Sequence, residues 1–80
     1  MEAEYSKQAA KAISRMDTVT KRRIRKGIDD IPDGDIRPLK GSEDTFRLRI
    51  GDWRVLFSYP DVDKVLVEKI SPRGEVYKGV

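Results

Sequence analysis

The chain has 80 residues, which is enough for one domain, spanning residues 1–80, and too few for two independent cores. It contains neither cysteine nor histidine, so disulfides, thiolate or imidazole metal sites and Ser-His or Cys-His catalytic arrangements are excluded. Apolar residues (38%) and charged residues (39%) predict a small globule with a highly charged surface. The chain has no apolar run of membrane-spanning length and no signal-peptide pattern, so we expect a cytoplasmic location.

The net charge of +3 is distributed unevenly along the chain. Residues 7–26 carry eight basic side chains against one acid, whereas residues 27–44 carry six acids against two bases. Such asymmetry is typical of a protein with an anionic partner, either a nucleic acid or an acidic protein. A well-solvated charged surface explains the same pattern equally well at this point.

The first predicted elements are a short extended segment from Glu2 to Tyr5 and a helix that begins after Ser6. Serine is a good N-cap, because its hydroxyl accepts a hydrogen bond from a free amide of the first turn. The helix has an apolar stripe about three turns long, made of Ala9, Ala10, Ala12, Ile13 and Met16.

A second helix follows, with either Asp17 or Thr18 as its cap. Its apolar positions have helical spacing and are Val19, Ile24, Ile28 and Ile31. Two antiparallel helices are therefore expected. Basic side chains fill most other positions of the second helix: Lys21, Arg22, Arg23, Arg25 and Lys26. This run is a candidate RNA- or ribosome-binding surface, and an ordinary solvated helix face is the alternative.

The segment after the helices carries turn residues and acids. Pro32 to Asp35 has strong turn chemistry, and Ile36 to Asp44 is interpreted as an irregular connection because it contains a proline and a glycine. The acids between Asp29 and Asp35 lack the spacing of a calcium loop, so they are interpreted as a helix end and a turn. No metal or cofactor is predicted.

The strongest pattern is TFRLRIGDWRVLFSY, residues 45–59, which predicts a β-hairpin with Gly51 and Asp52 as its loop. That loop pairs Ile50 with Trp53, Arg49 with Arg54, Leu48 with Val55 and Arg47 with Leu56. One side of the hairpin is then apolar and available to the helices: Phe46, Leu48, Ile50, Trp53, Val55, Phe57 and Tyr59. A turn at 60–63 and a third strand at 64–70 complete an antiparallel sheet.

The predicted register places Arg49 opposite Arg54 on the outer face of the hairpin, with Arg47 two residues away. Like charges directly opposite each other destabilise a sheet, so the pair indicates a bound anion. Guanidinium groups bind phosphate through two parallel hydrogen bonds, which makes an RNA or DNA backbone the natural ligand. The alternatives are arginines splayed into solvent or paired with Glu68.

Two further residues follow the last predicted strand at a spacing of four. Arg73 and Tyr77 are close enough in the chain to join the same face, although a tyrosine at that place is also typical of simple packing.

These parts together resemble the RelE/ParE superfamily of toxins from type II toxin–antitoxin modules, and most closely its RelE branch. The resemblance rests on SKQAAKAISRMD (6–17), PLKG (38–41), FRLRIGDWRVLF (46–57) and ISPRGEVYK (70–78), which have the family's order and spacing. It covers almost the whole chain. It implies an α+β fold with the order β-α-α-β-β-β: a short N-terminal strand, two antiparallel helices and a mainly antiparallel sheet.

The resemblance also implies a function. Members of the RelE branch are metal-independent endoribonucleases that cut messenger RNA in the ribosomal A site, and a co-expressed antitoxin neutralises them. The family's site positions are matched here by Arg47, Arg49, Arg54, Arg73 and Tyr77. We expect the antitoxin to cover or displace the tail between Arg73 and Tyr77.

This chain departs from the family pattern in one respect, because arginine stands where the hairpin strand usually carries lysine. Arginine is a poor general base, since its pKa exceeds about 12. Proton transfer is therefore assigned to Tyr77, with Glu75 as the weaker candidate.

Two other functions fit the same family. One is a ParE-like inhibitor of DNA gyrase, and the other is a catalytically weak relative that only binds its antitoxin. The joint presence of Arg49, Arg54, Arg73 and Tyr77 favours the nuclease, because gyrase inhibition has no evident need for that set.

Overall fold

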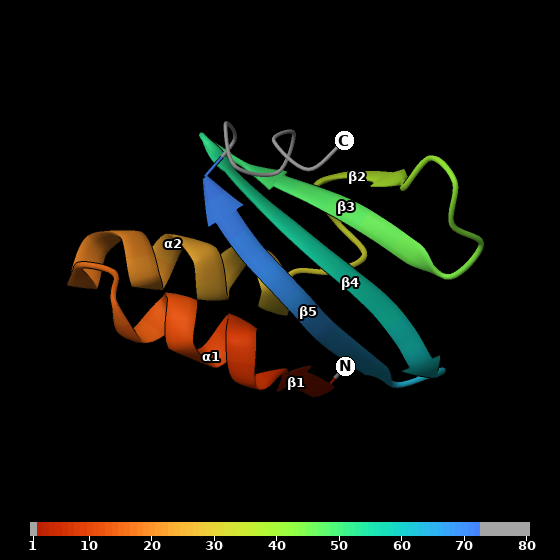
Figure 1. The fold of residues 1–80 in the computed structure, drawn as a ribbon, viewed down its shortest axis with the longest axis horizontal. Coiled ribbons are helices and arrows are strands. Elements are labelled where there is room, and N and C mark those ends of the chain that lie inside the picture. The colour runs from red at the N-terminus through yellow and green to blue at the C-terminus, as the bar shows by residue number, and fades with distance from the viewer. Residues whose placement is uncertain (1, 73–80) are drawn as a thin grey trace.

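The computed structural model of the chain describes residues 2–72. Five strands form one sheet in the order β1-β5-β4-β3-β2, and the two helices pack against one of its faces (Figure 1). Only β1 and β5 pair in parallel, and the other neighbours are antiparallel. The α+β class with antiparallel helices is therefore confirmed. The elements are β1 Glu2–Tyr5, α1 Lys7–Ser14, α2 Thr18–Asp29, β2 Asp35–Pro38, β3 Thr45–Ile50, β4 Trp53–Asp61 and β5 Lys64–Pro72.

The order of elements contains one strand more than predicted. Part of the segment interpreted as irregular forms β2, which pairs with β3 so that Ile36 lies opposite Leu48. Strand β2 has only four residues and ends in a proline, so it lacks the alternation of apolar and polar residues that predicts a strand. The strand forms because β3 has an open edge whose backbone groups need partners. Pro38 is tolerated there because β2 is itself an edge strand.

The turn predicted at residues 60–63 is shorter in the structure. Strand β4 continues to Asp61, which lies opposite Lys64, so that Val62 and Asp63 alone form the tip. Pro60 therefore lies within the end of a strand. Its missing N–H is harmless because β3 begins at Thr45, opposite Ser58, and does not extend this far.

Both helices begin at the predicted caps. The Ser6 hydroxyl accepts a hydrogen bond from the Ala9 amide (3.0 Å) and donates one to the Glu68 carbonyl (2.7 Å), which joins the start of α1 to β5. Asp17, rather than Thr18, caps α2 by accepting a hydrogen bond from the Thr20 amide at 3.2 Å.

The apolar faces of the helices are narrower than predicted. Helix α1 ends at Ser14, before Met16, and Ala10 is exposed. Val19 is 69% exposed, because it lies in the first turn of α2 on the side away from the sheet. Ile24 and Ile28 are buried against the sheet as expected, and Ile31 is buried just beyond the helix end.

The Asp17 cap predicts a pH dependence of stability. The hydrogen bond from Thr20 lowers the pKa of the Asp17 carboxyl, so its contribution is present above the unfolded pKa of about 3.9 and is lost as the pH falls through the lower folded value. Asp17→Asn retains a cap that does not titrate. We expect thermal unfolding from pH 7 to pH 2 to show an acid-dependent loss in the wild type that is smaller in Asp17→Asn. Equal losses in both proteins would contradict this assignment.

The hairpin has the predicted register at every pair, from Ile50 opposite Trp53 to Arg47 opposite Leu56. Its apolar side lies on the helices, and Leu48, Val55 and Phe57 are among the buried residues of the core. Tyr59, at the far end of that side, is 37% exposed. Within residues 2–72, neither helix has the length and apolar character required to cross a membrane.

Candidate nucleic-acid interface

The face of the sheet that the helices leave uncovered carries two rows of basic side chains. Residues paired across neighbouring strands project from the same face, and successive residues of a strand alternate between faces. Because Leu48 and Val55 face the helices, the residues beside them face outward. The first row is Asp35, Arg49, Arg54 and Ser71, and the second is Arg37, Arg47, Leu56 and Lys69.

Arg54 is the most enclosed of these charges. It is only 4% exposed, and it lies on the central strand β4 with Arg49 opposite it on β3 and Ser71 opposite it on β5. Ser71 is buried to the same degree. A guanidinium held this firmly has little freedom to lose when it binds an anion, so its position is preorganised.

Exposure increases from the centre of the sheet toward β3. Arg47 is half-buried, and Arg49 is exposed with its Nε donating a hydrogen bond to the Gly51 carbonyl at 3.4 Å. The predicted juxtaposition of Arg49 and Arg54 is confirmed by the register. The alternative in which these arginines extend into solvent describes Arg49, which is exposed, but not Arg54, which is buried.

Two residues of this face were missed by the sequence interpretation. Arg37 lies opposite Arg47 on the unexpected strand β2, where it pairs with Asp35 (Nε to Oδ1, 3.8 Å). Lys69 lies opposite Leu56 because a β-bulge near Glu68 shifts the register of β5. The bulge has a sequence signal: the inward residues Val65 and Val67 are two apart, but the next one is Ile70, three further on.

Leu56 lies at the centre of the basic face. Arg47 and Lys69 flank it on the neighbouring strands, and Arg54 is two residues away on its own strand. Strands lie about 4.8 Å apart, so Arg47 and Lys69 are anchored about 10 Å from each other. Leu56 is the apolar residue between these two basic positions.

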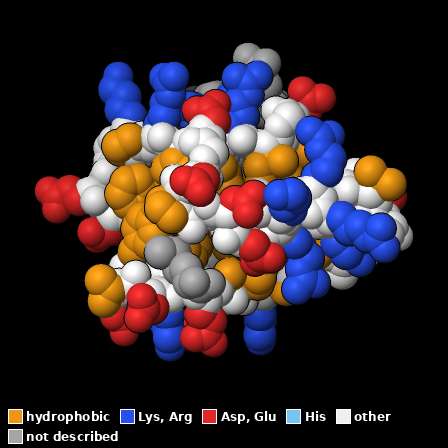
Figure 2. All heavy atoms as spheres, turned by 180° about the vertical axis from the view of Figure 1, so that it is seen from behind, with side chains coloured by type: hydrophobic (Ala, Val, Ile, Leu, Met, Phe, Trp, Pro, Cys, Tyr) orange, Lys and Arg blue, Asp and Glu red, His pale blue; other side chains and the backbone are white. Residues whose placement is uncertain are grey.

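The basic run of α2 forms a separate surface in the helical layer. Lys21 is half-buried, and Arg22, Arg23, Arg25 and Lys26 are exposed. Most of this run lies on the helical side of the sheet, away from the two arginine rows, but Arg23 extends to Gly51 at the hairpin tip, where Arg49 also binds. Figure 2 shows several Lys and Arg side chains close together at one side of the back of the molecule, with others along its upper and lower edges.

Some members of this run have neighbours within the domain. The Arg23 guanidinium reaches Gly51 at the tip of the hairpin. Lys26 pairs with Asp30 at 3.2 Å. Burial raises the pKa of the Tyr5 phenol, and the adjacent Arg25 opposes this shift.

The remaining predicted site residues, Arg73 and Tyr77, and the weaker candidate Glu75 lie outside the described residues. Strand β5 is described as far as Pro72, which follows Ser71.

Solved structures with the same arrangement are known. One is the RelB–RelE antitoxin–toxin complex from Methanococcus jannaschii, with a TM-score of 0.76 and 18% identity over 94% of this chain and 95% of the matched chain. Another is the archaeal RelE–RelB complex from Pyrococcus horikoshii OT3, with a TM-score of 0.71 and 27% identity over 91% of this chain and 94% of the matched chain. No protein-family model and no curated protein matches the sequence.

The arrangement of two helices on a five-stranded, mainly antiparallel sheet is therefore that of the RelE fold. The resemblance to RelE that the sequence motifs indicated is therefore confirmed at the level of the fold.

Proposed function

We propose that this protein is the toxin of a type II toxin–antitoxin module, and that it cleaves messenger RNA in the ribosomal A site without a metal ion. The fold shared with the RelE chains of two RelB–RelE complexes supports the toxin assignment. The observation that carries the nuclease assignment is the position of Arg54, which is nearly buried and lies directly opposite Arg49 on the face of the sheet away from the helices. Two neighbouring guanidinium groups suit a phosphate, because each can bind it through paired hydrogen bonds.

The chemistry follows from the residue types. The ribose 2′-hydroxyl attacks the adjacent phosphorus, the bond to the 5′-oxygen breaks, and the products are a 2′,3′-cyclic phosphate and a 5′-hydroxyl. Arg54 and Arg49 stabilise the additional negative charge on the phosphate in the transition state. Arg47 and Leu56 hold the nucleotide in line for attack.

The reaction also moves two protons. Tyr77 is the proposed proton carrier because the arginines are poor general bases, and Glu75 is the weaker candidate. Lys69 is a third, because the bulge of β5 brings its amine to the same face as Arg47 and Arg54. An ammonium group can donate a proton to the departing 5′-oxygen, which an arginine does poorly.

The basic surface of α2 is proposed to bind ribosomal RNA. Exposed lysines and arginines contact phosphates without reading sequence, and they position the bound protein. Binding through α2 leaves the opposite face of the sheet free for the message.

A cognate antitoxin is the proposed protein partner, and the cytoplasm is the proposed location, since both ribosome and message are found there. The fold match to RelB–RelE complexes supports the partner. An acidic segment that folds on binding suits a domain of net charge +3.

Primer extension on a defined message in a purified translation system tests this function. Wild-type protein is expected to produce cuts within the A-site codon only when ribosomes are present. Arg73→Ala and Tyr77→Phe are expected to weaken the cuts, and Lys40→Ala, which removes an exposed charge from a turn, serves as the matched control. An intact message would reject the nuclease, and a supercoiling assay would then distinguish a gyrase inhibitor from a protein that only binds its antitoxin.

A further inference from the structure

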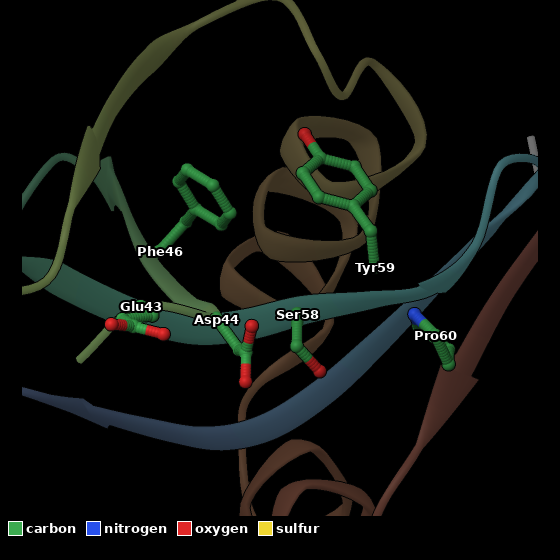
Figure 3. A pocket seen from close by; sticks show the side chains of 6 residues that line it. All are labelled: Glu43, Asp44, Phe46, Ser58, Tyr59 and Pro60. Atoms are coloured by element: carbon green, nitrogen blue, oxygen red, sulfur yellow. The ribbon is translucent and has the colours of Figure 1, made fainter.

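A hollow of about 370 Å³ lies at the end of the sheet where β4 extends past β3. Strand β3 starts at Thr45, opposite Ser58, so the edge of β4 beyond Ser58 has no strand partner on that side. The loop before β3 forms the other wall. The hollow is lined by Glu43, Asp44, Phe46, Ser58, Tyr59 and Pro60 (Figure 3).

Two aromatic rings form the apolar part of this hollow. Phe46 and Tyr59 meet edge to face with their centroids 5.4 Å apart, and both contact the fully buried Phe57. Figure 3 shows both rings projecting from the same side of the sheet. Tyr59 nevertheless remains 37% exposed, so the rings are held in place by the core while part of their surface faces solvent.

Two carboxylates form the polar part. Glu43 and Asp44 belong to a loop whose shape is set by Ser42, because the Ser42 hydroxyl accepts hydrogen bonds from the Asp44 and Thr45 amides (3.4 and 3.2 Å). Within residues 2–72, the ion pairs of the structure join Lys26 to Asp30, Arg37 to Asp35 and Lys64 to Glu4, and none uses Glu43 or Asp44. Both carboxylates are exposed.

This combination selects a cation and rejects a nucleic acid. Aromatic rings attract a guanidinium through cation–π contact, and carboxylates bind it through paired hydrogen bonds. Phosphate would be repelled by the same carboxylates. Figure 2 shows apolar side chains gathered on one side of the back of the molecule, with acidic side chains near them.

We infer that this hollow is a docking site for an arginine side chain of a protein partner. The guanidinium stacks on Tyr59 and Phe46 and pairs with Glu43 or Asp44. The neighbouring surface suits the apolar flanks of such a segment, since Val62 is 85% exposed and Pro60 lines the hollow. The occupant is a protein because only a protein presents a guanidinium together with apolar side chains. The inference does not require RNA cleavage and holds whether or not the protein is a nuclease.

The probe for this site is the tripeptide Leu-Arg-Leu, acetylated and amidated, titrated into the full chain labelled with ¹⁵N. Leu-citrulline-Leu is the matched control, because citrulline has nearly the same shape without the charge. Amide signals of residues 42–46 and 58–60 are expected to move with the arginine peptide, and the citrulline peptide is expected to bind at least about fivefold more weakly.

Substitutions at the residues that line the hollow test whether the peptide binds there. The combined variant Glu43→Gln and Asp44→Asn, and separately Tyr59→Leu, are each expected to weaken binding several-fold. The combined variant Asp33→Asn and Asp52→Asn removes the same charge from exposed positions elsewhere, and is expected to bind normally. The spectrum of each variant reports whether it is folded. Equal binding of the two peptides, shifts confined to other residues, or full binding by the Glu43 and Asp44 variant would overturn the inference.

Discussion

Replacing Arg54 with alanine is expected to lower ribosome-dependent cleavage by about 10²–10³-fold, the usual effect of removing one preorganised donor to transition-state charge. Arg54 is 4% exposed on the central strand, so its guanidinium is already in place before the substrate arrives. Arg54→Lys keeps the positive charge but loses the planar pair of donors, and is expected to recover only a small part of the activity. Single-turnover cleavage with saturating ribosomes measures the effect.

Stability must be separated from chemistry in this experiment, because Arg54 is buried. Urea unfolding of each variant gives the free energy of unfolding, and cleavage is compared at a temperature where all are folded. Lys40→Ala, which removes an exposed charge from the turn after β2, is expected to cleave like the wild type. Full activity in Arg54→Ala would exclude Arg54 from the reaction.

Replacing Phe57 with alanine is expected to lower the free energy of unfolding by about 3–5 kcal/mol. Phe57 is fully buried, stacks on Phe46 with ring centroids 5.8 Å apart, and meets Tyr59 edge to face. The total free energy of unfolding of a small domain is typically about 5–15 kcal/mol, so this loss is a large share of it. Urea denaturation measures the free energy of unfolding. If its dependence on urea concentration is the same as in the wild type, the surface exposed on unfolding has not changed.

Phe46→Leu and Phe57→Leu provide the comparison. Leucine fills most of the space of the phenylalanine ring, so Phe57→Leu is expected to lower the free energy of unfolding by less than Phe57→Ala. Phe46 is only half-buried, so Phe46→Leu is expected to lower the free energy of unfolding by less than Phe57→Leu. A loss below about 1 kcal/mol for Phe57→Ala would contradict the packing seen around it.

Much of the candidate site was predictable because it depends on a hairpin. Two-residue loops favour particular turn types, and the alternation of apolar residues allows only one register to bury them. Gly51, which has a φ of +58°, lies in this loop. Once the register is known, Arg49 must lie opposite Arg54, as the structure confirms.

The other residues of the site could not be predicted from the hairpin pattern. Arg37 belongs to a strand that exists only because β3 offers it an edge. The spacing of Val67 and Ile70 indicates that Lys69 faces outward. The bulge that places Lys69 opposite Leu56 can be assigned only when the partner strand is known. The neighbours of Arg54 come from strands on both sides, and one of them, β5, lies outside the hairpin in the sequence.

The amino-acid sequence by itself determined the helix cap at Ser6, the start of the second helix at Asp17 or Thr18, the hairpin register and the apolar side of the sheet. Each of these depends on residues close together in the chain, where backbone geometry and side-chain alternation leave few choices. The tertiary structure alone decided the parallel pairing of β1 with β5, the addition of β2, the enclosure of Arg54 and the hollow beside Tyr59. These depend on which strand edges meet and where one strand ends before its neighbour, and such contacts form between segments that local patterns do not connect.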